Sequence, residues 1–198
     1  MKKSALVYSI VVILLFTIAG LLFLVPLWGV LTTNSMVSSY EEVQSKAAAI
    51  ETQLQRRNDL IPNFVATVKG YAAHEEEVYT EIADARAKLS GAIDNNDMAS
   101  VSKANQELES ALSRLLVVVE NYPELKANEN FIALQDELAG TENRIARARN
   151  EYNEEVMSYN KQIKVFPNSI IANMAGFEEA VYFKAEEGAE KAPTVDLS

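Results

Sequence analysis

The sequence ALVYSIVVILLFTIAGLLFLVPLW, residues 5–28, is almost entirely apolar and contains no charged side chain. A hydrocarbon core of about 30 Å requires roughly 20 apolar residues in a helix, so this stretch is long enough to cross a membrane once. Tyr8 and Trp28 lie near its two ends, where aromatic rings favour the headgroup region. The stretch predicts a transmembrane helix at about residues 5–28, within a membrane anchor of residues 1–32.

A cleavable signal peptide is the alternative to this anchor, because Lys2 and Lys3 precede the apolar stretch. The apolar region of a signal peptide usually has about 7 to 15 residues, which is shorter than the stretch found here. No clear small-x-small cleavage pattern occurs between Val25 and Ser35. The sequence therefore favours an uncleaved anchor.

The charges that flank the anchor predict its orientation. Lys2 and Lys3 lie on one side, and Glu41 and Glu42 are the first charges on the other. Because cytoplasmic flanks carry an excess of lysine and arginine, we expect the N-terminus in the cytoplasm. The remainder of the chain is then periplasmic or extracellular.

Composition narrows the classes of function. The chain has 198 residues, so roughly 165 follow the anchor, enough for one compact domain. A net charge of -10, from 28 acidic and 18 basic residues, argues against a nucleic-acid partner. Cysteine is absent, which excludes disulfides, thiolate nucleophiles and thiolate metal sites from this sequence.

Residues 33–185 show the spacing of long amphipathic helices and contain few helix breakers. The first stripe resumes after Gly70, which predicts one long helix that bends at Pro62, where the hydrogen bond to the Asn58 carbonyl is lost. Its members are Val43, Ala47, Ile50, Leu54, Arg57, Ile61, Phe64 and Val68, then Ile82, Arg86 and Leu89.

Local signals delimit the remaining helices. Asp94 to Asp97 can cap a second helix that ends at Asn121-Tyr122-Pro123, and Asn128 can cap a third that ends before Phe166-Pro167. Ser169 to Ala175 predicts a short helix closed by Gly176. The predicted fold is all-α: a transmembrane helix followed by an antiparallel bundle of three long helices plus a short fourth helix. Residues 186–198 form an acidic tail that we expect to be disordered.

His74 with Glu75, Glu76 and Glu77 is the one cluster that resembles a metal site. A catalytic zinc needs about three protein ligands and a carboxylate-bridged bundle site needs two Glu-x-x-His pairs, which one histidine cannot supply. We therefore interpret the cluster as a solvated acidic turn. No phosphate-binding loop, nucleophile elbow or catalytic triad occurs, so we expect no enzyme, no cofactor and no metal.

Charged residues on the apolar stripes are more informative. Arg57 and Arg86 lie on the first stripe, and Glu142 and Arg149 lie on that of the third helix. Since a lone buried charge is costly, these side chains either reach solvent at the edge of the stripe or form ion pairs between helices, for example Arg57 with Glu142. Tyrosine and asparagine also recur on the third helix, where we expect hydrogen-bonding core or boundary positions rather than a ligand pocket.

Several motifs together make the chain resemble the bacterial LemA family. They are Gln53-Leu54-Gln55-Arg56-Arg57-Asn58-Asp59-Leu60-Ile61-Pro62-Asn63, Val68-Lys69-Gly70-Tyr71, His74-Glu75, Tyr122-Pro123-Glu124-Leu125-Lys126-Ala127-Asn128, Phe131, Thr141-Glu142-Asn143-Arg144-Ile145-Ala146, Ala148-Arg149, Tyr152-Asn153 and Phe166-Pro167. The resemblance implies a single-pass anchor that carries a helical bundle. Together with the orientation predicted from the flanking charges, we expect the anchor in the bacterial inner membrane and the bundle on its periplasmic or extracytoplasmic side. A relative in magnetotactic bacteria is associated with forming magnetosome membranes, which suggests membrane organisation; the family carries over no catalytic residues.

Three hypotheses follow. The first is a non-enzymatic membrane scaffold that self-associates and organises the envelope membrane, with lipid and other copies of the chain as partners. The second is an adaptor that binds another envelope protein, and the third is a metal-dependent hydrolase that uses His74. The candidate structural or interface residues are Arg56, Arg57, His74, Glu75, Glu142 and Arg149.

Overall fold

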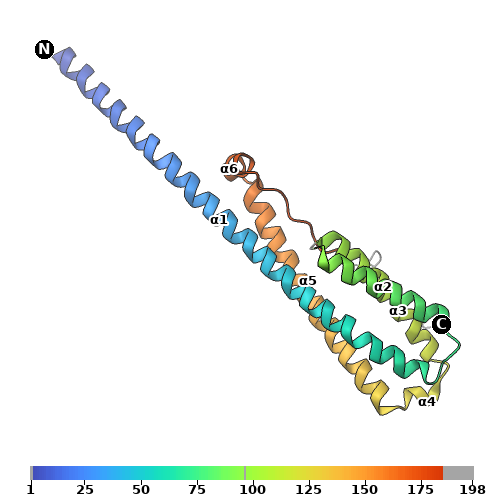
Figure 1. Ribbon diagram of the computed structural model, residues 1–198. Helices are drawn as coiled ribbons and strands as arrows, with labels where there is room; N and C mark the ends of the chain where they lie inside the picture. Colours follow the sequence, from blue (N-terminus) through green and yellow to red (C-terminus); the bar gives the residue numbers. More distant parts are fainter. Residues whose placement is uncertain (1, 96, 185–198) are drawn as a thin grey trace, which may run out of the picture. The chain divides into compact units, whose positions relative to one another are not determined.

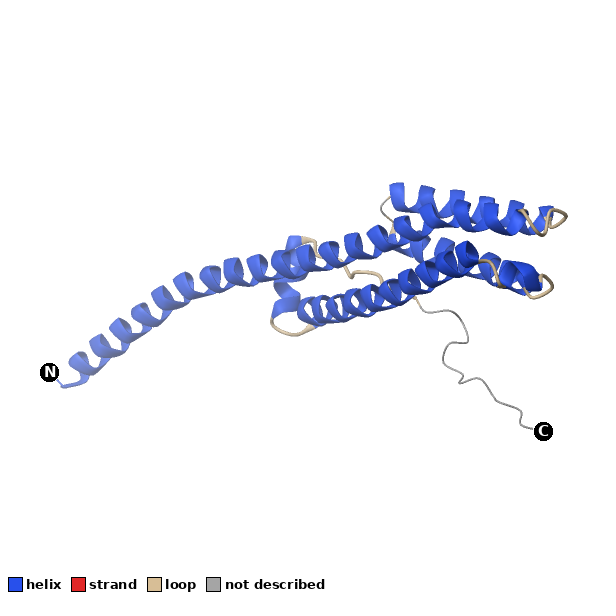
Figure 2. Cartoon of the chain, turned by 90° about the horizontal axis from the view of Figure 1, so that it is seen from below, coloured by secondary structure: helices blue, strands red, loops and turns tan. Residues whose placement is uncertain are grey.

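The computed structural model describes residues 2–95 and 97–184, and these residues form helices and loops without a strand (Figure 2). The all-α prediction is therefore confirmed. In chain order the helices are α1 (Lys2–Lys69), α2 (Glu76–Asp94), α3 (Met98–Val119), α4 (Pro123–Lys126), α5 (Glu129–Lys164) and α6 (Asn168–Ala175) (Figure 1). The tail predicted at residues 186–198 lies outside the described residues.

Helix α1 is continuous through Pro26, Gly29 and Pro62. It is the one helix among the described residues that is long and apolar enough to cross a membrane. The apolar side chains in the first part of α1 are exposed, for example Phe16 at 76% and Leu22 at 72%. An exposed apolar surface of this extent is stable in lipid and costly in water, which agrees with the predicted anchor.

The prediction that the first bundle helix continues past Gly70 is wrong. α1 ends at Lys69, and the amides of Tyr71 and Ala72 both bond to the Val68 carbonyl, at 3.0 and 2.9 Å. The chain then reverses into α2 as a separate helix. The apolar stripe of α2 is in phase with the stripe of α1 in the sequence, so helical periodicity alone did not reveal the turn between them.

Capping residues explain the other helix ends. The Asp97 side chain accepts a hydrogen bond from the Ala99 amide at 3.1 Å at the start of α3, and Asn128 accepts from the Phe131 amide at 3.1 Å at the start of α5. Gly176 ends α6 with a φ of 75°, a conformation that glycine adopts without strain. Helix α4, which begins at Pro123, was not predicted from the sequence.

The chain divides into two compact units. The first unit contains the residues up to Glu42 and Met157–Ala180: the apolar part of α1, the last turns of α5, and α6. Its buried side chains are Thr32, Met36, Tyr159, Asn160, Ile163 and Ala172.

The second unit contains Val43–Val156 and the described residues from Val181 onward. Within it α2 and α3 lie side by side as an antiparallel pair (Figure 1). The rings of Phe64 on α1 and Phe131 on α5 stack with their centroids 5.1 Å apart. Other fully buried side chains of this unit are Ile50, Leu54, Ile61, Val68, Leu89, Val101, Leu108, Ala111, Leu115, Leu125, Ile145 and Val156.

Candidate functional site

A buried polar cluster lies inside the second unit, where α1, α3 and α5 meet. It consists of Arg57 from α1, Asn105 and Glu109 from α3, and Glu142 and Arg149 from α5. Arg57 is only 2% exposed and Asn105 is fully buried. Arg57, Glu142 and Arg149 were candidates from the sequence, and the structure brings all three together.

Arg57 is the centre of the cluster. One terminal nitrogen, Nη1, pairs with Glu142 and lies 3.5 Å from Glu109 Oε1, while Nη2 donates to the Asn105 side-chain oxygen. Asn105 in turn donates to Glu109 at 2.7 Å. Arg149 approaches the same Glu109 oxygen at 3.3 Å, so one carboxylate serves both guanidinium groups.

The cluster contains two cations and two anions, so it is neutral as a whole. Burial of a guanidinium is costly unless its charge is matched, and a shift of one helix by a turn would separate the partners. The arrangement therefore favours one register of α1, α3 and α5. Asn105 and Glu109 were missed by the sequence analysis, although their spacing of four residues places them on one face of α3.

A second polar contact explains how α1 tolerates Pro62. Arg86 on α2 donates from Nε to the Asn58 main-chain oxygen at 3.2 Å and to the Asn58 side-chain oxygen at 2.9 Å. Asn58 also donates to Ser90 at 2.9 Å. Arg86 thus reaches the carbonyl that Pro62 leaves without its helical partner.

The remaining sequence candidates lie apart from the buried cluster. Arg56 is on the surface and pairs with Glu137 of α5 at 2.6 Å. His74 is exposed and Glu75 half-buried in the turn that precedes α2. Within residues 2–95 and 97–184, no group of three or more histidine or carboxylate side chains could hold a metal ion.

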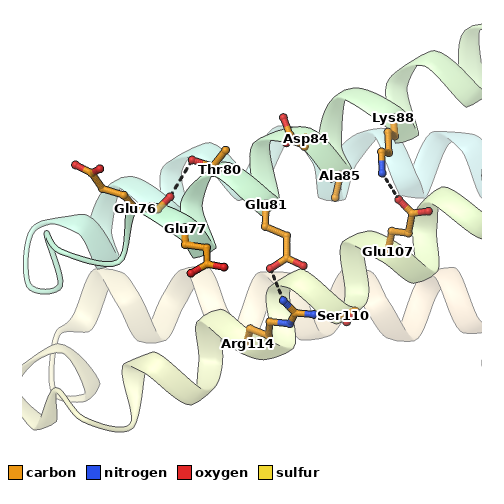
Figure 3. Close-up of a pocket in the computed structure, with 10 residues that line it drawn as sticks. All are labelled: Glu76, Glu77, Thr80, Glu81, Asp84, Ala85, Lys88, Glu107, Ser110 and Arg114. Carbon is orange, nitrogen blue, oxygen red and sulfur yellow. Dashed lines mark hydrogen bonds and ion pairs between the residues drawn. The ribbon is translucent and has the colours of Figure 1, made fainter.

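An acidic groove runs between α2 and α3 on the surface of the second unit (Figure 3). Glu81 pairs with Arg114 at 2.8 Å and Lys88 pairs with Glu107 at 2.7 Å, as the dashed lines in Figure 3 show. The hydrogen bond from Lys88 lowers the pKa of Glu107. The lining residues are Glu76, Glu77, Thr80, Glu81, Asp84, Ala85, Lys88, Glu107, Ser110 and Arg114, which include five carboxylates and two cations.

Two tyrosine-asparagine pairs on α5 hold the extended chain after α6. In the first unit the Asn160 amide donates to the Ala180 carbonyl and accepts from the Ala180 amide, at 2.9 and 2.8 Å. In the second unit Asn153 forms the same two bonds with Phe183, both at 2.9 Å. Tyr159 and Tyr152 donate to the Glu178 and Val181 carbonyls.

These pairs recur seven residues apart on α5. Hydrogen-bonding roles were predicted for these residues from the sequence, but their partners were not, because the partners are main-chain atoms. A main-chain partner leaves no side-chain pattern in the sequence.

The comparison with protein families identifies the chain. The sequence model of the LemA family matches residues 46–197, which include every residue of the buried cluster and both tyrosine-asparagine pairs. The chain belongs to the LemA family. The fold that this family resemblance implied, an apolar helix followed by a helical bundle, is the fold observed.

The chain is also similar to several individual proteins. Magnetosome protein MamQ of Magnetospirillum gryphiswaldense is 27% identical over 175 residues, with 76% of this chain and 64% of the relative covered. Magnetosome protein MamQ 2 of Paramagnetospirillum magneticum is 28% identical over 176 residues, with 76% and 64% covered. Protein LemA of Metamycoplasma hominis is 25% identical over 154 residues, with 78% and 69% covered. The chain spans a little less than two thirds of the length of these magnetosome relatives.

Proposed function

We propose that this protein is a non-enzymatic, membrane-anchored helical scaffold that self-associates and organises the bacterial envelope membrane. The observation that carries the proposal is the continuity of α1. One helix supplies the exposed apolar stretch and also Arg57, the centre of the buried polar cluster. Every copy of the bundle is thereby tied to the bilayer by its own core helix.

Two further observations support a scaffold. The buried cluster favours one helix register, and a uniform bundle is what repeated association of copies requires. Exposed apolar side chains on the second unit offer contact surface, with Val117 on α3 at 68% and Ile132 on α5 at 44%. The similarity to proteins named for the magnetosome agrees with a role at a membrane surface.

Copy number in the native bilayer tests the scaffold. The full chain, extracted in polymer-bounded membrane discs and counted by stepwise photobleaching, is expected to show several copies per disc that persist on dilution. A single copy per disc at every expression level, with no crosslinking in cells, would overturn the proposal. In a control, an unrelated transmembrane helix replaces the apolar stretch of α1. This control separates association through the bundle from association through the apolar stretch.

The proposal includes an orientation in the inner membrane. The N-terminus lies in the cytoplasm, and the bundle lies on the periplasmic or extracytoplasmic side. The chain contains no cysteine, so a single introduced thiol is unique. Ala139→Cys places that thiol at an exposed position on α5. An impermeant maleimide is expected to label this thiol in intact cells. Labelling only after lysis would show the opposite orientation.

An adaptor is the competing candidate, and the acidic groove between α2 and α3 favours it. Five carboxylates against two cations would suit a basic segment of an envelope protein. A reversal of the groove charge by Glu77→Lys with Asp84→Lys would then abolish capture of a stoichiometric partner. Under the scaffold proposal the same variant leaves the copy number unchanged.

A further inference from the structure

The corner between α5 and α6 carries four exposed apolar side chains, Val165, Phe166, Ile170 and Met174, which we call the α6 patch. Phe166 is 81% exposed and Met174 is 80% exposed. No charged residue occurs from Val165 to Phe177. A patch of this kind is costly in water and marks a surface that another apolar phase covers.

Contacts within the first unit place α5 along α1 in the antiparallel direction. The Tyr159 ring lies 5.5 Å from the Tyr40 ring, measured between centroids. Three residues further along α5, Gln162 donates to the Ser35 hydroxyl at 2.9 Å. Each step toward the end of α5 therefore moves toward the apolar stretch of α1.

Helix α6 continues this progression and lies beside the end of the apolar stretch. The Ile171 Cδ1 atom is 3.7 Å from the position that a Cβ atom would take at Gly29, the residue after Trp28. The two helices line one groove, formed by Pro26, Gly29, Val30, Thr33, Asn34, Ile171, Met174 and Ala175. Figure 1 shows α6 beside this part of α1.

We infer that the α6 patch is a second membrane contact, with α6 in the headgroup region of the bilayer that α1 crosses and with Phe166 and Met174 among the acyl chains. The inference rests on the membrane anchor of the proposed function. Leu27 and Leu31 of α1 are 44% and 60% exposed and belong to the apolar surface that lipid covers. A bilayer that covers them also reaches α6, because α6 packs against the same turns of α1.

The size and charge of this corner fit a position at the membrane surface. Eight residues of helix are about 12 Å long, too short to span a bilayer, so α6 lies at its surface. Lys164 and Glu178-Glu179 carry the charges that flank this corner, and Lys164 forms an ion pair with Glu179 at 2.7 Å. Their pairing reduces the cost of holding charge close to lipid.

Tryptophan fluorescence can measure this contact, because Trp28 is the only tryptophan of the chain. The full-length protein is reconstituted in phosphatidylcholine and phosphatidylglycerol vesicles whose acyl chains are brominated near the headgroup end. Trp28 of the unaltered protein reports insertion of α1. In the Trp28→Phe background, Phe166→Trp and Met174→Trp report the α6 patch.

Met157→Trp is the matched control. Met157 is 58% exposed on α5, two residues from Tyr159 and hence at the level of Tyr40. Tyr40 lies about 18 Å along α1 beyond Trp28, from a rise of 1.5 Å per residue. This tryptophan is expected to keep its emission in brominated vesicles and to remain open to aqueous iodide.

Loss of most of the emission at positions 166 and 174, with little loss at 157, is the expected result. Unquenched emission at 166 and 174 that iodide also reaches would overturn the inference and leave the anchor intact. Emission at 166 and 174 that neither the brominated chains nor iodide quenches would indicate that a second copy covers the patch. This result would also overturn the inference. An unquenched Trp28 would overturn the anchor itself, whereas self-association is judged separately by copy number.

Discussion

Arg86 on α2 donates a hydrogen bond of 3.2 Å to the main-chain carbonyl of Asn58, the carbonyl that Pro62 leaves without its helical donor. A proline inside a helix normally removes one backbone hydrogen bond and leaves an acceptor unpaired. Here a side chain from the neighbouring helix supplies the missing donor. The cost of Pro62 and the position of α2 are therefore linked.

This link predicts non-additive effects of Pro62→Ala and Arg86→Met. With Pro62 in place, Arg86→Met leaves buried acceptors on Asn58 unpaired and is expected to cost about 1–3 kcal/mol of unfolding free energy. In the Pro62→Ala background the new backbone amide bonds the same carbonyl, so the cost is expected to fall by about 1 kcal/mol. Urea unfolding of the full-length protein in detergent, followed by circular dichroism, measures all four variants.

Arg114→Met is the control for that cycle, because Arg114 is an exposed partner of Glu81. Loss of a surface ion pair is expected to change the unfolding free energy by less than about 1 kcal/mol in either background. Equal costs of Arg86→Met with proline and with alanine at position 62 would refute the link.

The buried cluster predicts strong coupling around Arg57. Arg57→Met is expected to cost about 3–5 kcal/mol, because it leaves the Glu109 carboxylate, which is only 16% exposed, with less compensation. Glu142→Gln is expected to cost only about 1 kcal/mol, since the Glu142 side chain is 43% exposed and solvent screens its charge. A double-mutant cycle in the same unfolding assay measures the coupling energy between Arg57 and Glu142. Additive costs would show that Glu142 does not contribute to the stability of the cluster.

The asparagine contacts predict local rather than global changes. Asn160→Ala removes two hydrogen bonds to Ala180, each worth about 1 kcal/mol, so exchange of the Ala180 amide hydrogen is expected to accelerate by about thirtyfold. Asn160→Asp keeps the acceptor for this amide and is expected to have a smaller effect. Hydrogen exchange read by mass spectrometry checks both variants. Asn143→Ala, at an exposed position of α5, is the control and is expected to leave this exchange unchanged.

The start of α3 predicts a pH dependence on the acid side. Hydrogen bonds from the Ser100 hydroxyl and from the Ala99 and Ser100 amides hold the pKa of Asp97 below its ordinary value of 3.8. A carboxyl with a lowered folded-state pKa contributes stability that is complete above the unfolded value and is lost as the pH falls through the folded value. Thermal unfolding across this acid range is therefore expected to show a smaller decrease for Asp97→Ser, which keeps a capping oxygen but does not titrate. An identical acid dependence in both proteins would contradict the assignment.

The sequence was sufficient where structure depends on local chemistry. Asp97, Asn128 and Gly176 end or begin helices through their own side chains or backbone freedom, and each lies where the sequence analysis placed a helix boundary. The sequence did not decide whether α1 is continuous, because Pro26 and Gly29 are as compatible with a break as with a helix in lipid.

The sequence was insufficient where partners come from elsewhere in the chain. The turn after Lys69 was missed because Ile82 and Leu89 keep the phase of the α1 stripe while lying on a reversed helix. Asn105 and Glu109 were missed because a polar residue on an amphipathic helix acquires a buried role only when Arg57 arrives from another helix. Long-range pairing of this kind is a property of packing and not of helical periodicity.

The asparagine contacts on α5 also constrain how this part of the chain can evolve. Asn160 and Asn153 bond the main-chain atoms of Ala180 and Phe183, so they specify the path of the segment and not its sequence. Val181 and Tyr182 are 51% and 43% exposed, so these main-chain contacts place no requirement on their side chains. Proline, which has no amide hydrogen to donate, is the residue that natural variation must avoid at positions 180 and 183.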